Sequence, residues 1–108
     1  MHCSRLPRFW PALSLAAAAA FAAPAQADLA LARAKNCMSC HTAERKVIGP
    51  SFKDIAARYR SQEGAESLLA AKILKGGSGV WGPVPMPANT QVSEAEARKL
   101  AAWVLRAH

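Results

Sequence analysis

The residues with the most distinctive chemistry are two cysteines and a histidine in the string Cys37-Met38-Ser39-Cys40-His41. This C-x-x-C-H spacing suits a redox-active dithiol, a zinc site or the covalent attachment of a c-type haem. A redox dithiol needs a βαβ scaffold, and the sequence has no alternating strand pattern. A zinc site needs about four ligands, whereas residues 28–108 hold only one further Cys or His, which is His108. Haem attachment is therefore the interpretation that the motif favours.

In this interpretation each residue of the motif has its own task. Cys37 and Cys40 form thioethers with the two vinyl groups of one haem, and His41 binds the iron. One helical turn is enough to bring both sulfurs to the porphyrin edge and to turn His41 onto its face. An exported chain suits this chemistry, and both cysteines of residues 28–108 are used by it.

A second iron ligand is sought among the other residues that commonly bind haem iron. Met38 lies between the two cysteines, on the same side as His41, and His108 is the chain end. Met86 lies in Val84-Pro85-Met86-Pro87, where the prolines stiffen an extended backbone. The alternative for Met86 is a gap-filling core residue, but this Pro- and Gly-rich segment has no helical periodicity. We therefore expect Met86 to bind the iron opposite His41.

The first 27 residues have the pattern of a cleaved Sec signal peptide. Arg5 and Arg8 form a basic start, residues 9–23 are an apolar run, and Ala25-Gln26-Ala27 is a small-residue cleavage site. An uncleaved amphipathic anchor is the alternative, which two prolines and the Ala-x-Ala ending disfavour. We expect cleavage after Ala27, a periplasmic location without stable membrane insertion, and one domain over residues 28–108.

The charge of the chain points to protein partners. The 108 residues carry a formal net charge of +7, and loss of Arg5 and Arg8 with the leader lowers it to +5. In an exported domain we do not read this excess as nucleic-acid binding. The alternatives are an ordinary solvated surface and a basic rim around a haem crevice that attracts acidic partners. The candidates for such a rim are Lys35, Lys46, Lys53, Arg58, Arg60, Lys72 and Lys75.

The rest of the chain predicts about four helices and no strand, an all-α class. A first helix is expected over residues 28–40, and a second from the capping-box pattern of residues 51–54. A third spans residues 64–75 before Gly76-Gly77, and a fourth follows a second capping-box pattern at residues 93–96 and ends near Arg106. Residues 76–92 form a long loop, which is typical of a functional segment. So short a domain has a thin core, so we expect it to fold poorly without haem.

Several motifs together resemble a known family. They are residues 37–41, Gly49-Pro50, the string Gly79-Val80-Trp81-Gly82-Pro83-Val84-Pro85-Met86-Pro87, Asn89, and the closing Ala102-Trp103-Val104-Leu105. Over essentially all of residues 28–108 the chain resembles the small bacterial class I cytochromes c of the cytochrome c-551 type, also called c8. The resemblance implies the class I cytochrome c fold, with its helices wrapped around one covalent haem c.

The resemblance also implies roles for individual residues. Axial ligation would come from His41 Nε2 and Met86 Sδ, and Pro50 would accept a hydrogen bond from the His41 ring. Trp81 would donate to a haem propionate, with simple packing against the macrocycle as its alternative. Asn89 would contact the Met86 sulfur. Trp103 is interpreted as a packing residue without a role in the site.

The function expected from these features is one-electron transfer rather than catalysis. With both axial positions filled by side chains, the iron has no open position for a substrate. We expect a monomeric shuttle that forms transient complexes with a quinol-oxidising donor and with an acceptor. By resemblance the acceptor would be a nitrite reductase, a terminal oxidase or a peroxidase. The alternatives are an electron-transfer subunit of a larger enzyme and a haem peroxidase or gas sensor with a labile Met86.

Overall fold

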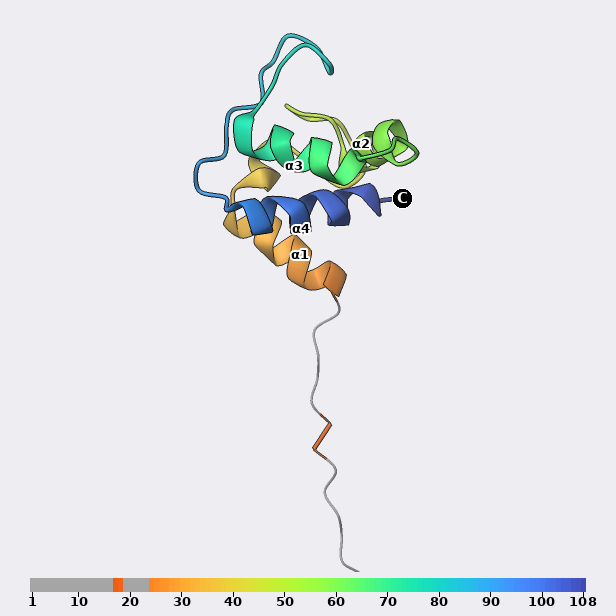
Figure 1. Cartoon of the computed structure of the whole chain (residues 1–108), viewed down its shortest axis with the longest axis vertical. Coiled ribbons are helices and arrows are strands. Elements are labelled where there is room, and N and C mark those ends of the chain that lie inside the picture. The colour runs from red at the N-terminus through yellow and green to blue at the C-terminus, as the bar shows by residue number, and fades with distance from the viewer. Residues whose placement is uncertain (1–16, 19–23) are drawn as a thin grey trace, which may run out of the picture.

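The structure is a computed structural model that describes residues 17, 18 and 24–108. Most of the predicted leader, residues 1–16 and 19–23, lies outside the described residues. Four α-helices and one 3-10 turn form the described part (Figure 1). They are α1 (Pro24–Ala34), η1 (Cys37–Ser39), α2 (Phe52–Tyr59), α3 (Ala65–Lys75) and α4 (Glu94–Leu105). Residues 24–108 contain no strand and only two isolated bridges, so the all-α prediction is confirmed.

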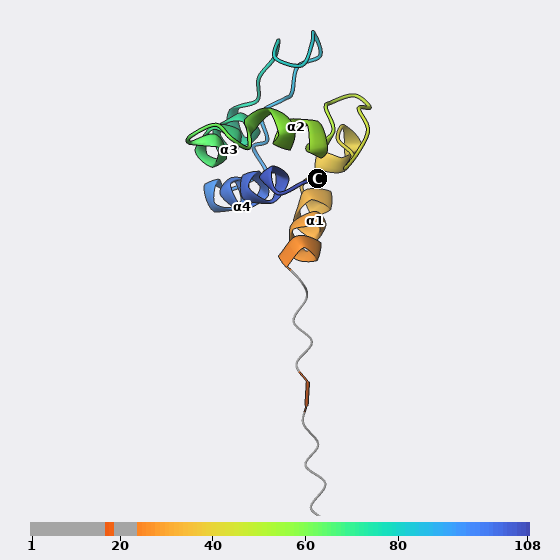
Figure 2. The same ribbon diagram turned by 90° about the vertical axis from the view of Figure 1, so that its right-hand side faces the viewer.

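The last helix, α4, is the centre of the packing. It contacts α1, α2 and α3, and its contact with α3 is the most extensive. Both views show α1 on the opposite side of α4 from the long loop that follows α3 (Figures 1 and 2). The core consists mostly of small and aliphatic side chains at helical spacing. Its buried members are Ala32, Tyr59, Ala65, Leu69, Ala70, Val92, Ala97, Leu100 and Ala101.

Two of the helices begin where the capping patterns predict. At α4 the Ser93 hydroxyl accepts from the Glu96 N–H at 3.1 Å, and the Glu96 carboxylate accepts from the Ser93 N–H at 3.0 Å. At α2 the buried Ser51 hydroxyl accepts from the Asp54 N–H at 3.0 Å. Within the described hydrogen bonds, α2 has only this half of the predicted box. Both arrangements satisfy donors that a helix start otherwise leaves unpaired.

The first helix differs from its predicted range of residues 28–40. It begins earlier, at Pro24, and ends at Ala34. Asn36 then adopts a left-handed conformation with φ 67°, which stops the helix, and the cysteine motif follows as the separate turn η1. Asparagine tolerates this conformation better than most residues. The prediction of one continuous helix was therefore wrong, because an Ala- and Leu-rich pattern does not reveal this single residue.

An ionic contact joins the first and last helices. The Asp28 side chain is buried, and its Oδ2 accepts from the Arg106 guanidinium at 3.2 Å. Its Oδ1 lies 3.6 Å from Lys99 Nζ. A buried carboxylate needs such partners, because its desolvation is costly when it is unpaired. Asp28 therefore joins α1 to α4 and to Arg106, the residue that follows it.

The loop of residues 76–92 extends beyond the end of α3 (Figure 1). It leaves α3 at Gly76 and returns to the core at the buried Val92. Over residues 17–18 and 24–108, no helix has the length and apolar character that crossing a bilayer requires.

Candidate functional site

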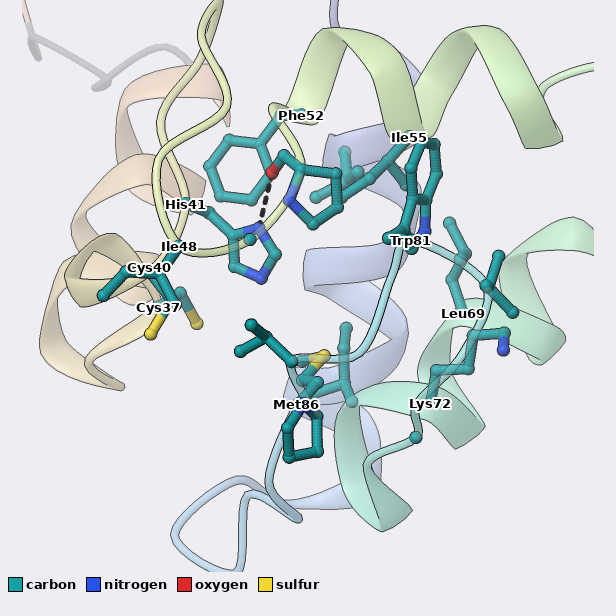
Figure 3. A pocket seen from close by; sticks show the side chains of 18 of the residues that line it. Cys37, Cys40, His41, Ile48, Phe52, Ile55, Leu69, Lys72, Trp81 and Met86 are labelled. Atoms are coloured by element: carbon teal, nitrogen blue, oxygen red, sulfur yellow. Dashed lines mark hydrogen bonds between the residues drawn. The ribbon is translucent and has the colours of Figure 1, made fainter.

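A cavity of about 580 Å³ opens between the cysteine motif and the long loop. Its lining is mostly apolar and comes from α1, η1, the loop of residues 40–50, α2, α3, the loop of residues 76–92 and α4. His41 and Met86 lie on opposite sides of it, with Cys37 and Cys40 at one edge and Trp81 and Lys72 at the other (Figure 3). The sequence therefore brings all four of the predicted attachment and ligand residues to one cavity.

His41 is held by a backbone oxygen. Its ring Nδ1 lies 2.7 Å from the carbonyl oxygen of Pro50. A carbonyl oxygen can only accept a hydrogen bond, so Nδ1 carries the ring proton and donates it. Nε2 is then left with its lone pair, which is the form of imidazole that binds a metal.

The faces of the His41 ring are also restricted. Phe52, the first residue of α2, stacks on the imidazole with ring centroids 5.4 Å apart and an angle of 23°. Phe52 and Trp103 in turn form an edge-to-face pair with ring centroids 5.1 Å apart. A Cβ atom added to Gly49 would lie 2.7 Å from His41 Cε1. Only a residue without a side chain fits there, so backbone and aromatic groups together set the orientation of the imidazole.

The two cysteines are free thiols in a compact turn. Cys37 and Cys40 are both half-buried, and the backbone N–H groups of Cys40 and His41 donate to the Cys37 carbonyl at 3.3 and 3.1 Å. Burial raises the pKa of the Cys37 thiol, and a hydrogen bond from its own backbone N–H opposes this only in part. The turn thus presents both sulfurs at the cavity edge, next to the histidine.

Met86 is fixed through its backbone. Its N–H donates to the Gly77 carbonyl at 2.8 Å, and its own carbonyl accepts from the Gly77 N–H at 3.0 Å. Gly76 has φ 73°, and a Cβ added there would lie 2.4 Å from the Met86 carbonyl oxygen. Pro85 and Pro87 limit the backbone on both sides. The half-buried Met86 side chain therefore projects into the cavity from a segment with little freedom.

Asn89 braces the end of this segment. Its side-chain amide donates to the Ile73 carbonyl at 2.8 Å and, more weakly, to the Pro87 carbonyl at 3.4 Å. The Asn89 backbone N–H also donates to Ile73 at 3.2 Å. Here the amide joins the Met86 segment to α3, and its contact with the Met86 sulfur stays a prediction.

Positive and aromatic groups gather at the far edge of the cavity. Trp81 is half-buried and lines the cavity, and the guanidinium of Arg58 lies 5.3 Å from the centre of its ring. Lys72 of α3 lines the same edge (Figure 3). This edge is suited to an anionic group, whereas the interior is suited to an apolar one.

The residues present fit a flat, apolar cofactor with acidic substituents. The cavity volume is within the usual range for such sites, roughly 300–1,000 Å³. Two thiols next to a histidine are the groups that C-x-x-C-H haem attachment requires, and an imidazole and a thioether are both groups that can bind haem iron. Among residues 17–18 and 24–108, no group of three or more His, Cys, Asp or Glu side chains forms a separate metal site.

Some residues of the site were not singled out from the sequence. Gly49 was noted only within Gly49-Pro50, Phe52 only within the capping-box pattern of residues 51–54, and Gly76-Gly77 only as a helix stop. Trp103, interpreted as a packing residue, also lines the cavity. The signals were a Gly-Pro pair soon after the histidine and paired glycines before the methionine loop. Their roles depend on tertiary distances that spacing alone does not give.

Comparisons with known proteins show the family of the chain. The family model described as "Cytochrome c" matches residues 29–107. The chain is 50% identical over 96 residues to cytochrome c-552 of Nitrosomonas europaea, covering 89% of this chain and 93% of that protein. It is 52% identical over 71 residues to cytochrome c-551 of Pseudomonas aeruginosa, covering 66% and 67%. The crystal structure of wild-type Nitrosomonas europaea cytochrome c552 superposes with a TM-score of 0.73, covering 74% of this chain and 99% of that one.

Proposed function

The chain belongs to the cytochrome c family, as an electron carrier rather than an enzyme, and we propose that it is a periplasmic one-electron shuttle with His41 and Met86 as axial ligands. The observation that carries the proposal is the placement of His41 and Met86 on opposite sides of one apolar cavity, with both cysteines at its edge (Figure 3). Haem c, when bound, supplies an iron that gains and releases a single electron.

The proposed task of His41 is to act as a fixed proximal ligand. Its Nδ1–H is committed to Pro50, so Nε2 is the donor nitrogen that faces the cavity. A backbone acceptor of this kind fixes the ring and increases its basicity. Phe52 prevents rotation of the imidazole, because the two rings stack at 5.4 Å.

The proposed task of Met86 is to close the other axial position. Its paired hydrogen bonds with Gly77 and the flanking prolines fix the backbone of Met86 and so hold the thioether in the cavity. A thioether is a soft, weak donor that favours the reduced iron and so raises the reduction potential. A ligand cage that is stiff on both sides changes little between oxidation states, which suits rapid outer-sphere transfer.

A pair of matched methionine variants tests the ligand assignment. Met86→Leu should abolish the Met-to-iron charge-transfer absorption of the oxidised protein, lower the reduction potential and let carbon monoxide bind the reduced protein. Met38→Leu is the control, because Met38 is half-buried against the core beside the cysteines. It should leave all three properties unchanged. An intact charge-transfer band in Met86→Leu would contradict the assignment, whereas binding of carbon monoxide by the reduced wild-type protein would favour the gas-sensor alternative.

The place of the protein in the cell is part of the proposal. We propose that residues 1–27 are removed after Ala27 and that the domain of residues 28–108 carries electrons from a quinol-oxidising complex to a reductase, oxidase or peroxidase. The sequence pattern of the leader supports this. Mass spectrometry with a haem-stained gel of the protein from a periplasmic fraction checks the cut and the covalent haem together. A mass that includes residues 1–27 would contradict it.

An electron-transfer subunit of a larger enzyme is the second candidate, because it would use the same haem chemistry. Native gel filtration separates the two. A free shuttle elutes as a small monomer, whereas a subunit elutes with a stable partner.

A further inference from the structure

Arg58 makes an unusual contact at the edge of the cavity. Its guanidinium carbon lies 5.3 Å from the centre of the Trp81 ring and 5.8 Å from that of Tyr59. A guanidinium within about 6 Å of an aromatic centroid is attracted to the ring face. Trp81 belongs to the loop of residues 76–92 and Arg58 to α2, so this contact joins two elements that border the cavity.

The helix geometry of α2 directs Arg58 to this place. Ile55 lines the cavity beside Trp81 (Figure 3), and Arg58 is three residues further along α2. Residues three apart in a helix lie on the same face. Arg58 therefore lies one turn beyond the cavity-lining Ile55, on the exposed side of Trp81.

Arg58 also has no competing ionic partner. Within the described residues its side chain forms none of the salt bridges, which involve Lys35, Arg98, Lys99 and Arg106. Its neighbour Arg60 differs, because that guanidinium donates to the Leu105 and Ala107 carbonyls at the end of α4. The charge of Arg58 is thus not neutralised by a carboxylate and remains beside Trp81.

We propose that Arg58 is a positioning residue of the haem edge, which clamps the Trp81 indole against α2 and holds a fixed positive charge at the mouth of the cavity. The clamp restrains the loop that carries Met86. The charge disfavours the oxidised, more positive iron and so raises the reduction potential, an effect that salt screens at an exposed site. The inference rests on the proposed binding of haem in this cavity.

Three substitutions in the haem-loaded protein test the proposal. Arg58→Gln removes the charge and weakens the stacking, whereas Arg58→Lys keeps the charge but loses the planar group. Arg98→Gln is the control for net charge, because Arg98 is exposed on α4, pairs with Glu94 of its own helix, and is not among the described residues that line the cavity. The two measurements are the reduction potential at low and high salt and the hydrogen exchange of the Trp81 indole N–H by NMR of the reduced protein.

The expected results separate the clamp from the charge. Arg58→Gln should lower the potential more than Arg98→Gln does, with a difference that shrinks at high salt. It should also speed Trp81 N–H exchange by about two- to fivefold, which corresponds to losing an exposed cation–π contact. Arg58→Lys should keep the reduction potential of the wild type. Its Trp81 N–H should exchange at a rate between those of the wild type and Arg58→Gln.

Either of two results overturns the proposal. One is a potential that Arg58→Gln and Arg98→Gln change equally, and the other is Trp81 exchange that neither Arg58 variant changes. A failure of the His41 and Met86 assignment would look different. It would appear in the wild-type protein itself, as a missing Met-to-iron absorption band.

Discussion

At the scale of single residues, the site depends on how tightly His41 is enclosed. The Pro50 carbonyl fixes one ring nitrogen, Phe52 covers a face, and Gly49 leaves just enough room for the ring. The chemistry of the cysteine motif could be predicted from spacing, because one turn of chain determines it. The packing around the His41 ring could not be predicted, because Gly49 and Phe52 reach His41 through a loop whose path the sequence pattern does not specify.

Gly49→Ala is expected to disturb this enclosure. The added methyl would lie 2.7 Å from His41 Cε1, so the ring or the loop must move. Overpacking of this kind destabilises a protein by about 1–3 kcal/mol. Guanidinium unfolding should show that loss, and the haem absorption bands should shift as the ligand tilts.

Gly77→Ala is the matched control for that experiment. A Cβ at Gly77 meets no atom within 4 Å, and the position does not need a positive φ. Its stability should change by no more than about 0.5 kcal/mol. Equal stabilities for the two variants would show that the close approach of Gly49 to His41 does not constrain the ring.

At the scale of elements, the local signals were accurate for three helices and misleading for one. Capping residues and apolar spacing located α2, α3 and α4, because these signals act within a few residues. The expected helix over residues 28–40 was broken at Asn36, where the turn that presents the cysteines needs a left-handed residue. The long loop was recognised as functional, but its pairing of Gly77 with Met86 is a contact between its two ends.

The capping box of α4 predicts a pH dependence of stability. A hydrogen bond from the Ser93 N–H and, next, the contact with Lys35 lower the pKa of Glu96 below its ordinary value of 4.5. Because its pKa is lower in the folded state, the Glu96 carboxylate stabilises the fold above pH 4.5. This stabilisation is lost as the pH falls through the pKa of the folded state. Glu96→Gln keeps an acceptor but removes the charge, so wild type should exceed it in stability at pH 7 and approach it near pH 3.

Chemical unfolding at both pH values checks this expectation. Repeating the comparison in a Lys35→Met background serves as the control, because part of the pKa change comes from Lys35. The pH-dependent difference should be smaller there. A difference that is the same at pH 3 and pH 7 would contradict the assigned role of the Glu96 charge.

At the scale of the whole molecule, the cavity takes up space that buried side chains would otherwise fill. The buried side chains gather mainly around α3 and α4, while α2 and both loops border the cavity. A domain this small buries too little apolar surface to be comfortably stable alone. Its all-α class and its family could be predicted from the sequence, because length, helical spacing and motifs are all local or compositional. The packing of α1 on α4 through Asp28 could not be predicted, because it joins residues that lie far apart in the sequence.

Preventing haem attachment should therefore unfold much of the domain. In Cys37→Ala/Cys40→Ala the covalent links are lost, and with them the stabilisation that a tightly held ligand gives to the folded state. Far-UV circular dichroism should show a large loss of helix and no cooperative thermal transition. Met86→Leu is the control, since it keeps both thioethers and should stay folded. A double variant with native helix content and a sharp transition would contradict this view of the core.

The contact of Asp28 with α4 has a consequence for the proposed removal of residues 1–27. Ala25, Gln26 and Ala27 lie in the first turn of α1, and Asp28 is only 2% exposed between Lys99 and Arg106. Ala25, Gln26 and Ala27 are exposed, but a peptidase needs an extended chain, which the helical conformation of these residues and the buried Asp28 beside them do not offer. If the leader is cut after Ala27, the cut must come before α1 settles on α4, or α1 must detach to permit it. The pairing of the Asp28 carboxylate with α4 would then end the period in which the precursor can be cleaved.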